Sequence, residues 1–327
     1  MKRGAAVALV LGLMGSGVGS ADSLEAQGSM VAAGEGTSAL GQFTIYLPDG
    51  YSPGTVSYLQ GATVDVSLAL ISRFGEVARA PFQLVVVESR GQFQEWVGNE
   101  LPKWIHAVAL EEPARVVVRV PKADNLDPAG HRFELTLLHE LTHTYLYRLQ
   151  PSRSGRGFPG WFHEGLAVYI SSGLDRGMHR ALIRGRVTGN YYTLDDLVRI
   201  YHTSSALSEM AYAQSLMAVQ SMAEFYGAGV FRELFDQMRG GLPFPTAFSA
   251  VAGEELDQFQ ARYQGALRRR YNLLLVVTDP AAIFILLPLL LMLAYFVRLR
   301  RNRVIRARWL AEGEADSDEG EEGLPTT

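Results

Sequence analysis

The first half of the chain contains short segments in which apolar and polar positions alternate. In one of them Phe43, Ile45 and Leu47 are separated by polar residues, as in a half-buried strand. Residues 82–89 and 114–120 are short β-branched runs, which predict buried strands. The N-terminal part of the chain is therefore predicted to be rich in strands, with helices between them.

Apolar positions at helical spacing predict a helix at 56–74, which stops at Gly75. Beyond residue 130 this spacing dominates. The sequence therefore predicts an α+β fold, with a strand-rich N-terminal lobe and a helical C-terminal lobe. The predicted helices of the second lobe lie at residues 131–149, 160–172, 193–201, 207–226, 231–239 and 254–270.

The first residues have the pattern of a secretory signal. Lys2 and Arg3 are followed by the apolar run 5–13 and by small residues up to Ala21. This predicts a signal peptide at 1–21, with an uncleaved anchor as the alternative. Residues 22–40 lack periodicity and predict a flexible leader.

A second apolar run lies near the C-terminus, where residues 281–297 carry no charge. It predicts one transmembrane helix within 272–297, with a buried helix of a folded domain as the alternative. Six arginines follow between Arg298 and Arg308, and they place the tail 298–327 in the cytoplasm by the positive-inside rule. Together the two termini predict a single-pass protein of the cell membrane whose domain, residues 41–271, is extracytoplasmic.

The composition of the chain restricts its possible partners and its possible metal ligands. The net charge of −4 argues against a nucleic-acid partner. Because the chain has no cysteine, a metal site would have to use histidine, aspartate or glutamate ligands.

The stretch LLHELTHTYL, residues 137–146, places three ionisable side chains in an apolar helix. His139 and His143 are four residues apart, so they share one helix face and can bind one zinc ion. Glu140 is rotated by about 100° from His139, where it can act as the general base on a water activated by the metal. The alternative is a pair of satisfied core histidines. Since an unpaired buried histidine pair is costly, the apolar surroundings favour a metal.

A catalytic zinc site needs a third protein ligand. Leu149 occupies the position six residues after His143, which excludes the metzincin pattern. The next candidates are His163 and Glu164 in PGWFHEGLAVYI, residues 159–170. They are adjacent, so on a helix they cannot both face the same ion.

The pair HELTH and GWFHEGLAVY resembles the gluzincin metallopeptidases, and more narrowly the peptidase MA-like domains of bacterial membrane or secreted proteins. The shared pattern comprises Trp161, Phe162, Glu164, Gly165 and Ala167, and the segment 211–227 is also similar. The resemblance covers roughly residues 41–270.

This resemblance implies a zincin-type metallopeptidase fold, a peptide or protein substrate, and one zinc ion per chain. It implies His139, His143 and Glu164 as the ligands and Glu140 as the general base. It also implies a tyrosine that stabilises the oxyanion, for which Tyr212 is the best match in the sequence. Tyr191, Tyr192 and His202 match less well.

Two other functions are compatible with the same residues. The chain could be a zinc-containing, membrane-tethered scaffold or chaperone-like binding protein without catalytic activity. It could also be a zinc hydrolase for a substrate other than a peptide. For a peptidase, we expect strand 114–120 to be an edge strand that pairs with an extended substrate.

Overall fold

The computed structural model describes residues 7–10, 30–98, 101–121, 132–150, 157–200, 205–271, 284 and 287–304. The strands come first along the chain and are β1 (Val7–Val10), β2 (Met30–Ser38), β3 (Gly41–Pro48), β4 (Phe82–Val87), β5 (Ile105–Leu110) and β6 (Arg115–Arg119). Two helices lie between them, α1 (Pro53–Phe74) and α2 (Arg90–Val97). The later helices are α3 (Arg132–Leu149), α4 (Gly160–Ser171), α5 (Arg176–Thr188), α6 (Leu194–Ile200), α7 (Ser205–Tyr226), α8 (Val230–Arg239), α9 (Phe244–Ala252) and α10 (Leu256–Arg270).

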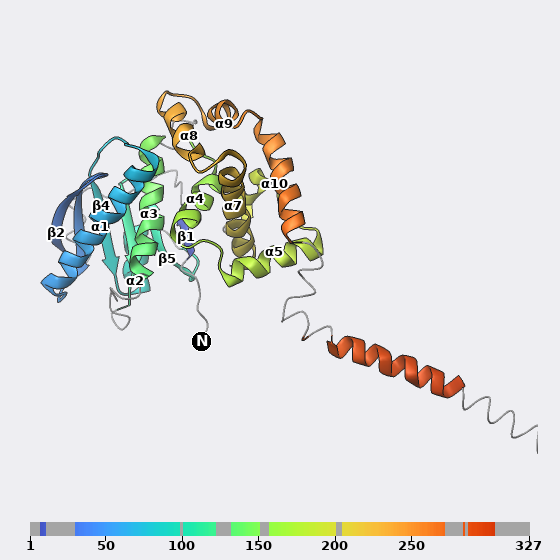
Figure 1. The fold of residues 1–327 in the computed structure, drawn as a ribbon. Coiled ribbons are helices and arrows are strands. Elements are labelled where there is room, and N and C mark those ends of the chain that lie inside the picture. Colours follow the sequence, from blue (N-terminus) through green and yellow to red (C-terminus); the bar gives the residue numbers. More distant parts are fainter. Residues whose placement is uncertain are drawn as a thin grey trace, which may run out of the picture. The chain divides into compact units, whose positions relative to one another are not determined.

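The described strands form one mixed sheet in the order β1-β5-β6-β4-β3-β2 (Figure 1). Strands β2 and β3 form an antiparallel hairpin, and β5 and β6 are also antiparallel. The pairs β3–β4, β4–β6 and β1–β5 are parallel. Strand β6 therefore lies inside the sheet, whereas β5 is near the edge that faces the helical part of the domain.

Helices cover both faces of this sheet. On one face, Phe93 and Trp96 of α2 pack against a cluster that includes Val85, Val108 and Val117. Side chains of neighbouring positions point to the other face, where α1 and α3 lie. Strands β4, β5 and β6 are buried on both faces, which explains why their apolar runs do not alternate strictly with polar residues.

The helix ends follow local chemistry. Ser52 accepts a hydrogen bond from the Thr55 N–H at the start of α1, and Pro53 occupies its first turn. Ser89 and Gln92 form a capping box at the start of α2. Gly75 follows α1 with a φ of 91°, a conformation that a residue with a side chain rarely adopts.

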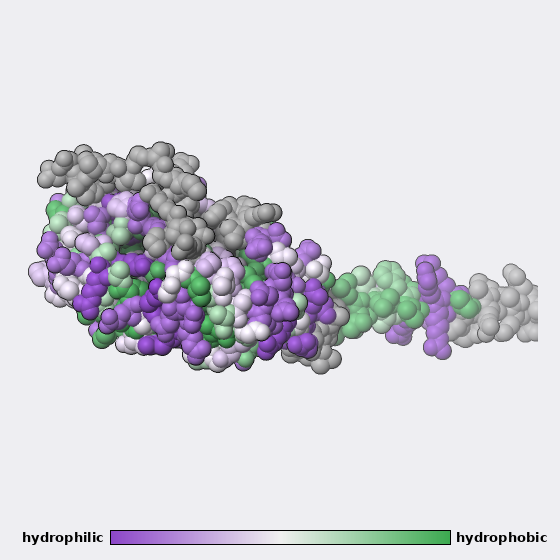
Figure 2. All heavy atoms as spheres, turned by 90° about the horizontal axis from the view of Figure 1, so that it is seen from above, coloured by the Kyte–Doolittle hydropathy of each residue, from purple (hydrophilic) through white to green (hydrophobic). Residues whose placement is uncertain are grey.

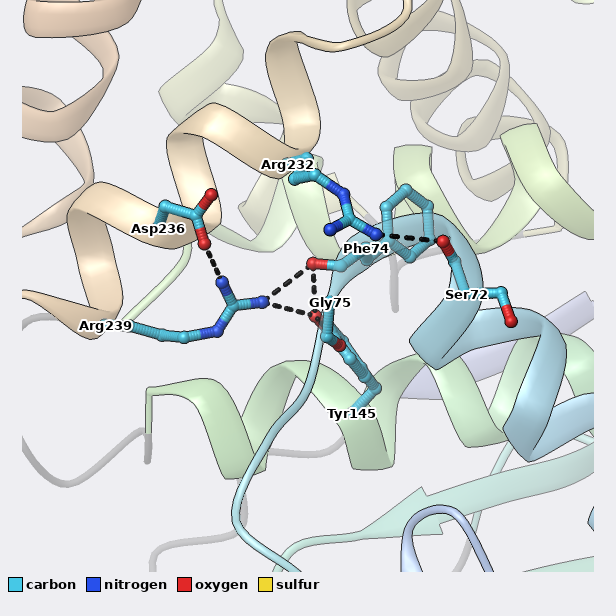
Figure 3. A network of polar contacts seen from close by, with 7 residues as sticks. All are labelled: Ser72, Phe74, Gly75, Tyr145, Arg232, Asp236 and Arg239. Carbon is cyan, nitrogen blue, oxygen red and sulfur yellow. Dashed lines mark hydrogen bonds and ion pairs between the residues drawn. The ribbon is translucent and has the colours of Figure 1, made fainter.

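The C-terminal end of α1 is held by side chains from two distant helices (Figure 3). Arg239 of α8 donates to the Phe74 carbonyl over 2.7 Å, and Arg232 donates to the Ser72 carbonyl over 2.9 Å. Tyr145 of α3 donates to the Phe74 carbonyl over 3.0 Å. The positive charges of these two arginines also interact favourably with the negative end of the α1 dipole. These contacts connect the sheet-bearing part of the chain to α3 and α8.

Many predicted elements are confirmed. The structure contains helices close to the six predicted beyond residue 130, and a helix that ends at Phe74 as expected. The strands at residues 43–47, 82–89 and 114–120 are also present. The sequence analysis did not predict α2, α5, α9 or β5.

The predicted fold class is wrong at the C-terminus, because no helix in the described part of the chain is both long and apolar enough to cross a membrane. Residues 287–304 are helical, and residues 287–297 of this helix carry no charge. Arg298, Arg300, Arg301 and Arg303 occupy the rest of that helix. Figure 2 shows the apolar segment followed by the charged one. The remaining residues of the predicted span, 272–283, 285 and 286, lie outside the described residues.

Two expectations for the N-terminal part also change. Strand β2 begins at Met30, so residues 30–38 of the predicted flexible leader belong to the sheet, while 22–29 lie outside the described residues. Residues 7–10 of the predicted signal peptide form β1, which pairs with β5. The rest of residues 1–21 is outside the described part, and the signal peptide stays a prediction.

The prediction that strand 114–120 is an edge strand is wrong. Strand β6 is hydrogen-bonded to β4 on one side and to β5 on the other. Its main-chain groups are therefore occupied and cannot pair with an extended substrate. The antiparallel return from β5 places β6 inside the sheet, and this depended on β5, which the sequence analysis had missed.

Candidate metal centre

Helix α3 presents His139, Glu140 and His143 to one buried region. All three side chains are buried, with His139 6% exposed and the other two fully covered. The helix is covered on several sides, by the sheet, α1 and α4. Its nearly all-apolar surface is thus a consequence of its central position, and the three ionisable groups are exceptions that need partners.

Helix α4 contributes the fourth ionisable side chain of this buried region, Glu164. Glu164 Oε2 lies 3.6 Å from His139 Nε2 and 3.8 Å from His143 Nε2. The three candidate ligand atoms all lie within 4.8 Å of one another. Bond lengths of about 2.0–2.2 Å in a tetrahedral zinc site place ligand atoms roughly 3.3 Å apart, and the two distances to Glu164 Oε2 are within about 0.5 Å of this spacing.

The donor atoms fit such an ion chemically. His139 Nε2 and both ring nitrogens of His143 are buried without a hydrogen-bond partner among the described residues. Leaving polar atoms in this state costs free energy, which coordination would recover. Two imidazoles and one carboxylate are also a usual donor set of catalytic zinc.

Ser171 orients His139. The Ser171 hydroxyl donates to the Ala167 carbonyl over 2.6 Å, so its oxygen is left to accept from His139 Nδ1 at 3.5 Å. The proton of a neutral His139 is then on Nδ1, and the lone pair of Nε2 points to the other ligands. Contacts of this kind fix the tautomer and the ring orientation of metal-binding histidines.

Glu140 is fully buried next to the three candidate ligands. Burial raises the pKa of its carboxyl well above the usual value, and the charge of Glu164 adds to this rise. The backbone of Ala109 in β5 acts in the opposite direction and lowers the pKa. Strand β5 therefore runs beside the candidate base, and the sequence analysis had not identified it as a strand although IHAVAL is a continuous apolar run apart from one histidine.

The neighbouring histidines are held in their neutral form. Burial lowers the pKa of His143, with further lowering by His139 and His163. Burial also lowers the pKa of His163 to about 3. The ring of His163 stacks on that of His143, with centroids 5.8 Å apart. His163 is not part of the group that could hold a metal, so of the two adjacent candidates it is Glu164 that joins His139 and His143.

Tyr212 lies on α7, which packs against the ligand-bearing α4. Its side chain is 1% exposed. The helices approach closely because Gly165 has no side chain: a Cβ atom there would lie 2.4 Å from the Ser215 carbonyl oxygen. Tyr212 is thus held within a few residues of the contact point, and its role in catalysis stays a prediction.

The less well matched candidates have other positions. The Tyr191 hydroxyl donates to the Leu182 carbonyl over 2.9 Å. The backbone N–H of Tyr192 donates to the Gln214 side chain. His202 lies outside the described residues. Two residues that the sequence analysis did not single out, Ser171 and Tyr147, lie against candidate site residues.

Comparison with known proteins gives three results. The family model of the Peptidase MA superfamily matches residues 62–269. No curated protein has a sequence that matches this chain. Similar solved structures include an M1 zinc metallopeptidase from Deinococcus radiodurans, with 16% identity, a TM-score of 0.41, and coverage of 68% of this chain and 47% of that one. Another is a mutant of the M1 zinc metallopeptidase from Deinococcus radiodurans bound to a Tyr-Ser-Ala substrate, with 17% identity, a TM-score of 0.41, and coverage of 72% and 51%.

The chain thus spans about half the length of these solved structures. The family match covers well over half of the 327 residues and includes the helices that carry all the candidate site residues. On this match, the chain belongs to the Peptidase MA superfamily.

Proposed function

We propose that the chain is a zinc-dependent peptidase that hydrolyses peptide bonds at the centre formed by α3 and α4. Zinc would be held by His139, His143 and Glu164, one ion per chain. The convergence of these three side chains from two helices is the observation that carries the proposal. When bound, zinc would polarise the substrate carbonyl and make a water molecule acidic enough to attack it near neutral pH.

Glu140 would transfer a proton from the attacking water to the leaving amine. Its carboxylate takes a proton from the attacking water and then gives it to the nitrogen of the departing amine. Burial and the nearby charge of Glu164 make this carboxylate a stronger base than an exposed one. The closed surroundings also exclude bulk water that would compete for the proton.

Tyr212 would stabilise the oxyanion by donating a hydrogen bond to it. The close contact of α7 with α4 supports this role, because it holds Tyr212 near the helix that carries Glu164. Tyr212→Phe should then lower kcat by about 100-fold without loss of zinc. Unchanged kcat in this variant would remove Tyr212 from the mechanism.

The test of the main proposal has two parts, both on the full chain. Native mass spectrometry should find one zinc ion per chain, and His143→Ala should lose it. Glu140→Gln should keep the zinc but lower peptide hydrolysis by at least about 100-fold. The exposed Glu233→Gln on α8 is the matched control and should leave hydrolysis unchanged.

The outcomes separate the alternatives. One zinc per chain without hydrolysis of any peptide, together with binding of unfolded proteins, would favour the non-catalytic scaffold. Full hydrolysis by Glu140→Gln would contradict the role of Glu140. Folded protein without zinc would make His139 and His143 core residues.

We also propose that the domain acts outside the cytoplasm. The support is the pattern of residues 1–21, with its basic start, apolar core and small-residue end. Protease added to intact cells with a permeable outer envelope should degrade an exported domain. Complete protection until the inner membrane is broken would contradict this location.

A further inference from the structure

Helix α3 carries two buried tyrosines, Tyr145 and Tyr147, that face opposite ways. At about 100° per residue, Tyr147 falls between Glu140 and His143 around the helix, whereas Tyr145 is on the far side. Side chains on a helix also tilt toward its N-terminus, so Tyr147 extends back toward the turn of His143. The geometry alone therefore directs one tyrosine to the candidate centre and the other to the core.

The contacts of Tyr147 agree with this direction. Its ring lies 5.2 Å from that of His163, which in turn stacks on His143. Its side chain is 5% exposed. Its hydroxyl oxygen is buried and has no hydrogen-bond partner among the described residues.

The surroundings of this hydroxyl are acidic. The pKa of Tyr147 is raised by burial and then by the charges of Glu164, Glu111 and Glu140. The phenol therefore stays protonated over the whole physiological range, so it can donate a hydrogen bond and cannot act as a base. Two of these three carboxylates are groups of the candidate centre.

Tyr145 provides the contrast. Its hydroxyl donates to the carbonyls of Phe74 and Gly75, at 3.0 and 3.1 Å, and accepts from Arg239 at 3.1 Å (Figure 3). These contacts satisfy the hydroxyl within the fold. Tyr145 is thus satisfied within the fold, whereas the Tyr147 hydroxyl has no acceptor in the part of the chain that the structure describes.

A buried donor without an acceptor is costly, and such groups in folded proteins call for an explanation. We propose that Tyr147 is a further substrate-contacting residue, whose hydroxyl donates a hydrogen bond to a backbone carbonyl oxygen of the peptide next to the scissile bond. A peptide supplies carbonyl acceptors at regular intervals. The inference rests on the proposed function, because it requires a peptide substrate at this centre.

The test compares Tyr147→Phe with Tyr145→Phe in the full chain. Tyr147→Phe should retain one zinc and an unchanged or raised melting temperature, because it removes an unsatisfied hydroxyl. Its kcat/KM for a peptide should fall by about 10-fold. Tyr145→Phe should keep its kcat/KM and lose about 2–8 °C of melting temperature, since its hydroxyl is used in the fold.

A binding measurement adds a readout that does not depend on turnover. In the Glu140→Gln background, a peptide should bind about 3–10-fold more weakly when Tyr147→Phe is added. Tyr145→Phe in the same background should leave the affinity unchanged. Unaltered kcat/KM and affinity in Tyr147→Phe would overturn this inference alone. Absence of turnover and of peptide binding in the zinc-loaded, unsubstituted chain would overturn the proposed function and this inference with it.

Discussion

Gly165 and Ser215 bring α4 and α7 into backbone contact. A Cβ atom on Gly165 would lie 2.4 Å from the Ser215 carbonyl oxygen and 2.7 Å from Val219 Cγ2. The glycine follows the candidate ligand Glu164, and Ser215 is three residues from Tyr212. The two helices therefore approach closely one residue after Glu164 and three residues after Tyr212.

Gly165→Ala should separate these helices. The added methyl group meets backbone, which cannot rotate away, so we expect a loss of about 1–3 kcal/mol in the free energy of unfolding. Peptide hydrolysis should fall as well, because Glu164 and Tyr212 lie on the two displaced helices. Urea denaturation and steady-state kinetics measure the two effects.

The control for this variant is Gly61→Ala on α1. A Cβ atom at Gly61 meets nothing within 4 Å. Alanine has the higher helix propensity, so this variant should be neutral or more stable by up to about 1 kcal/mol. Equal stability of the Gly165 and Gly61 variants would contradict the packing argument.

Ser171→Ala should weaken zinc binding. The variant removes the oxygen that accepts from His139 Nδ1, so the ring loses the contact that fixes its tautomer and orientation. Losses of 10–100-fold are usual for such groups, and the long 3.5 Å contact favours about 10-fold. Competition with a zinc-binding dye measures the affinity. Ser249→Ala, on the exposed side of α9, should bind zinc as the unsubstituted chain does.

His163 should make the stability of the zinc-free protein depend on pH. Its pKa in the folded state, about 3, is below the unfolded value of about 6.5. The unfolded chain therefore binds a proton more readily, and His163 contributes fully to the free energy of unfolding only above pH 6.5. This contribution is lost as the pH falls from 6.5 toward 3, by up to about 1.4 kcal/mol per pH unit. His163→Phe should reduce the slope of unfolding free energy against pH in this range. An unchanged slope would show that His163 is not held neutral by burial, and a substitution at the exposed His179 is the control.

Arg239→Ala should destabilise the fold through the end of α1. The variant removes the donor to the Phe74 carbonyl and to the Tyr145 hydroxyl. Since these groups are partly buried, we expect a loss of about 1–3 kcal/mol in thermal or urea unfolding. Arg270→Ala breaks an ion pair with Glu224 whose side chains are both about half exposed, and it should cost less than about 1 kcal/mol.

The elements confirmed from the sequence share one property, which is that their signal is local. The spacing of apolar residues within eighteen positions predicts the helix that carries His139 and His143. The β-branched run 82–89 predicts a strand without reference to any other segment. Strand β5 and helix α2 were missed although β5 is as long as the predicted strand β4 and α2 is longer than the predicted helix α6. Their apolar residues are recognised as a core only when both pack onto β4 and β6.

The membrane-span prediction is contradicted by the described residues, because none of their helices is both long and apolar enough to cross a membrane. The described helix 287–304 combines eleven uncharged residues with four arginines. The position of β6 was also misjudged, because an apolar run does not reveal how many neighbours a strand has in its sheet.

The sequence by itself predicted which residues could form the candidate centre. The i, i+4 spacing places two histidines on one helix face, and the glutamate after the first is set beside them by helix geometry alone. Only the tertiary structure decided that Glu164 reaches both histidines, that Ser171 lies 3.5 Å from His139 Nδ1, and that Tyr147 lies against His163 while Tyr145 is hydrogen-bonded to the end of α1. These relations join residues on different helices, and their distances depend on how the helices pack. Packing is set by the summed contacts of the whole core, such as the Gly165–Ser215 approach, which no short stretch of sequence encodes.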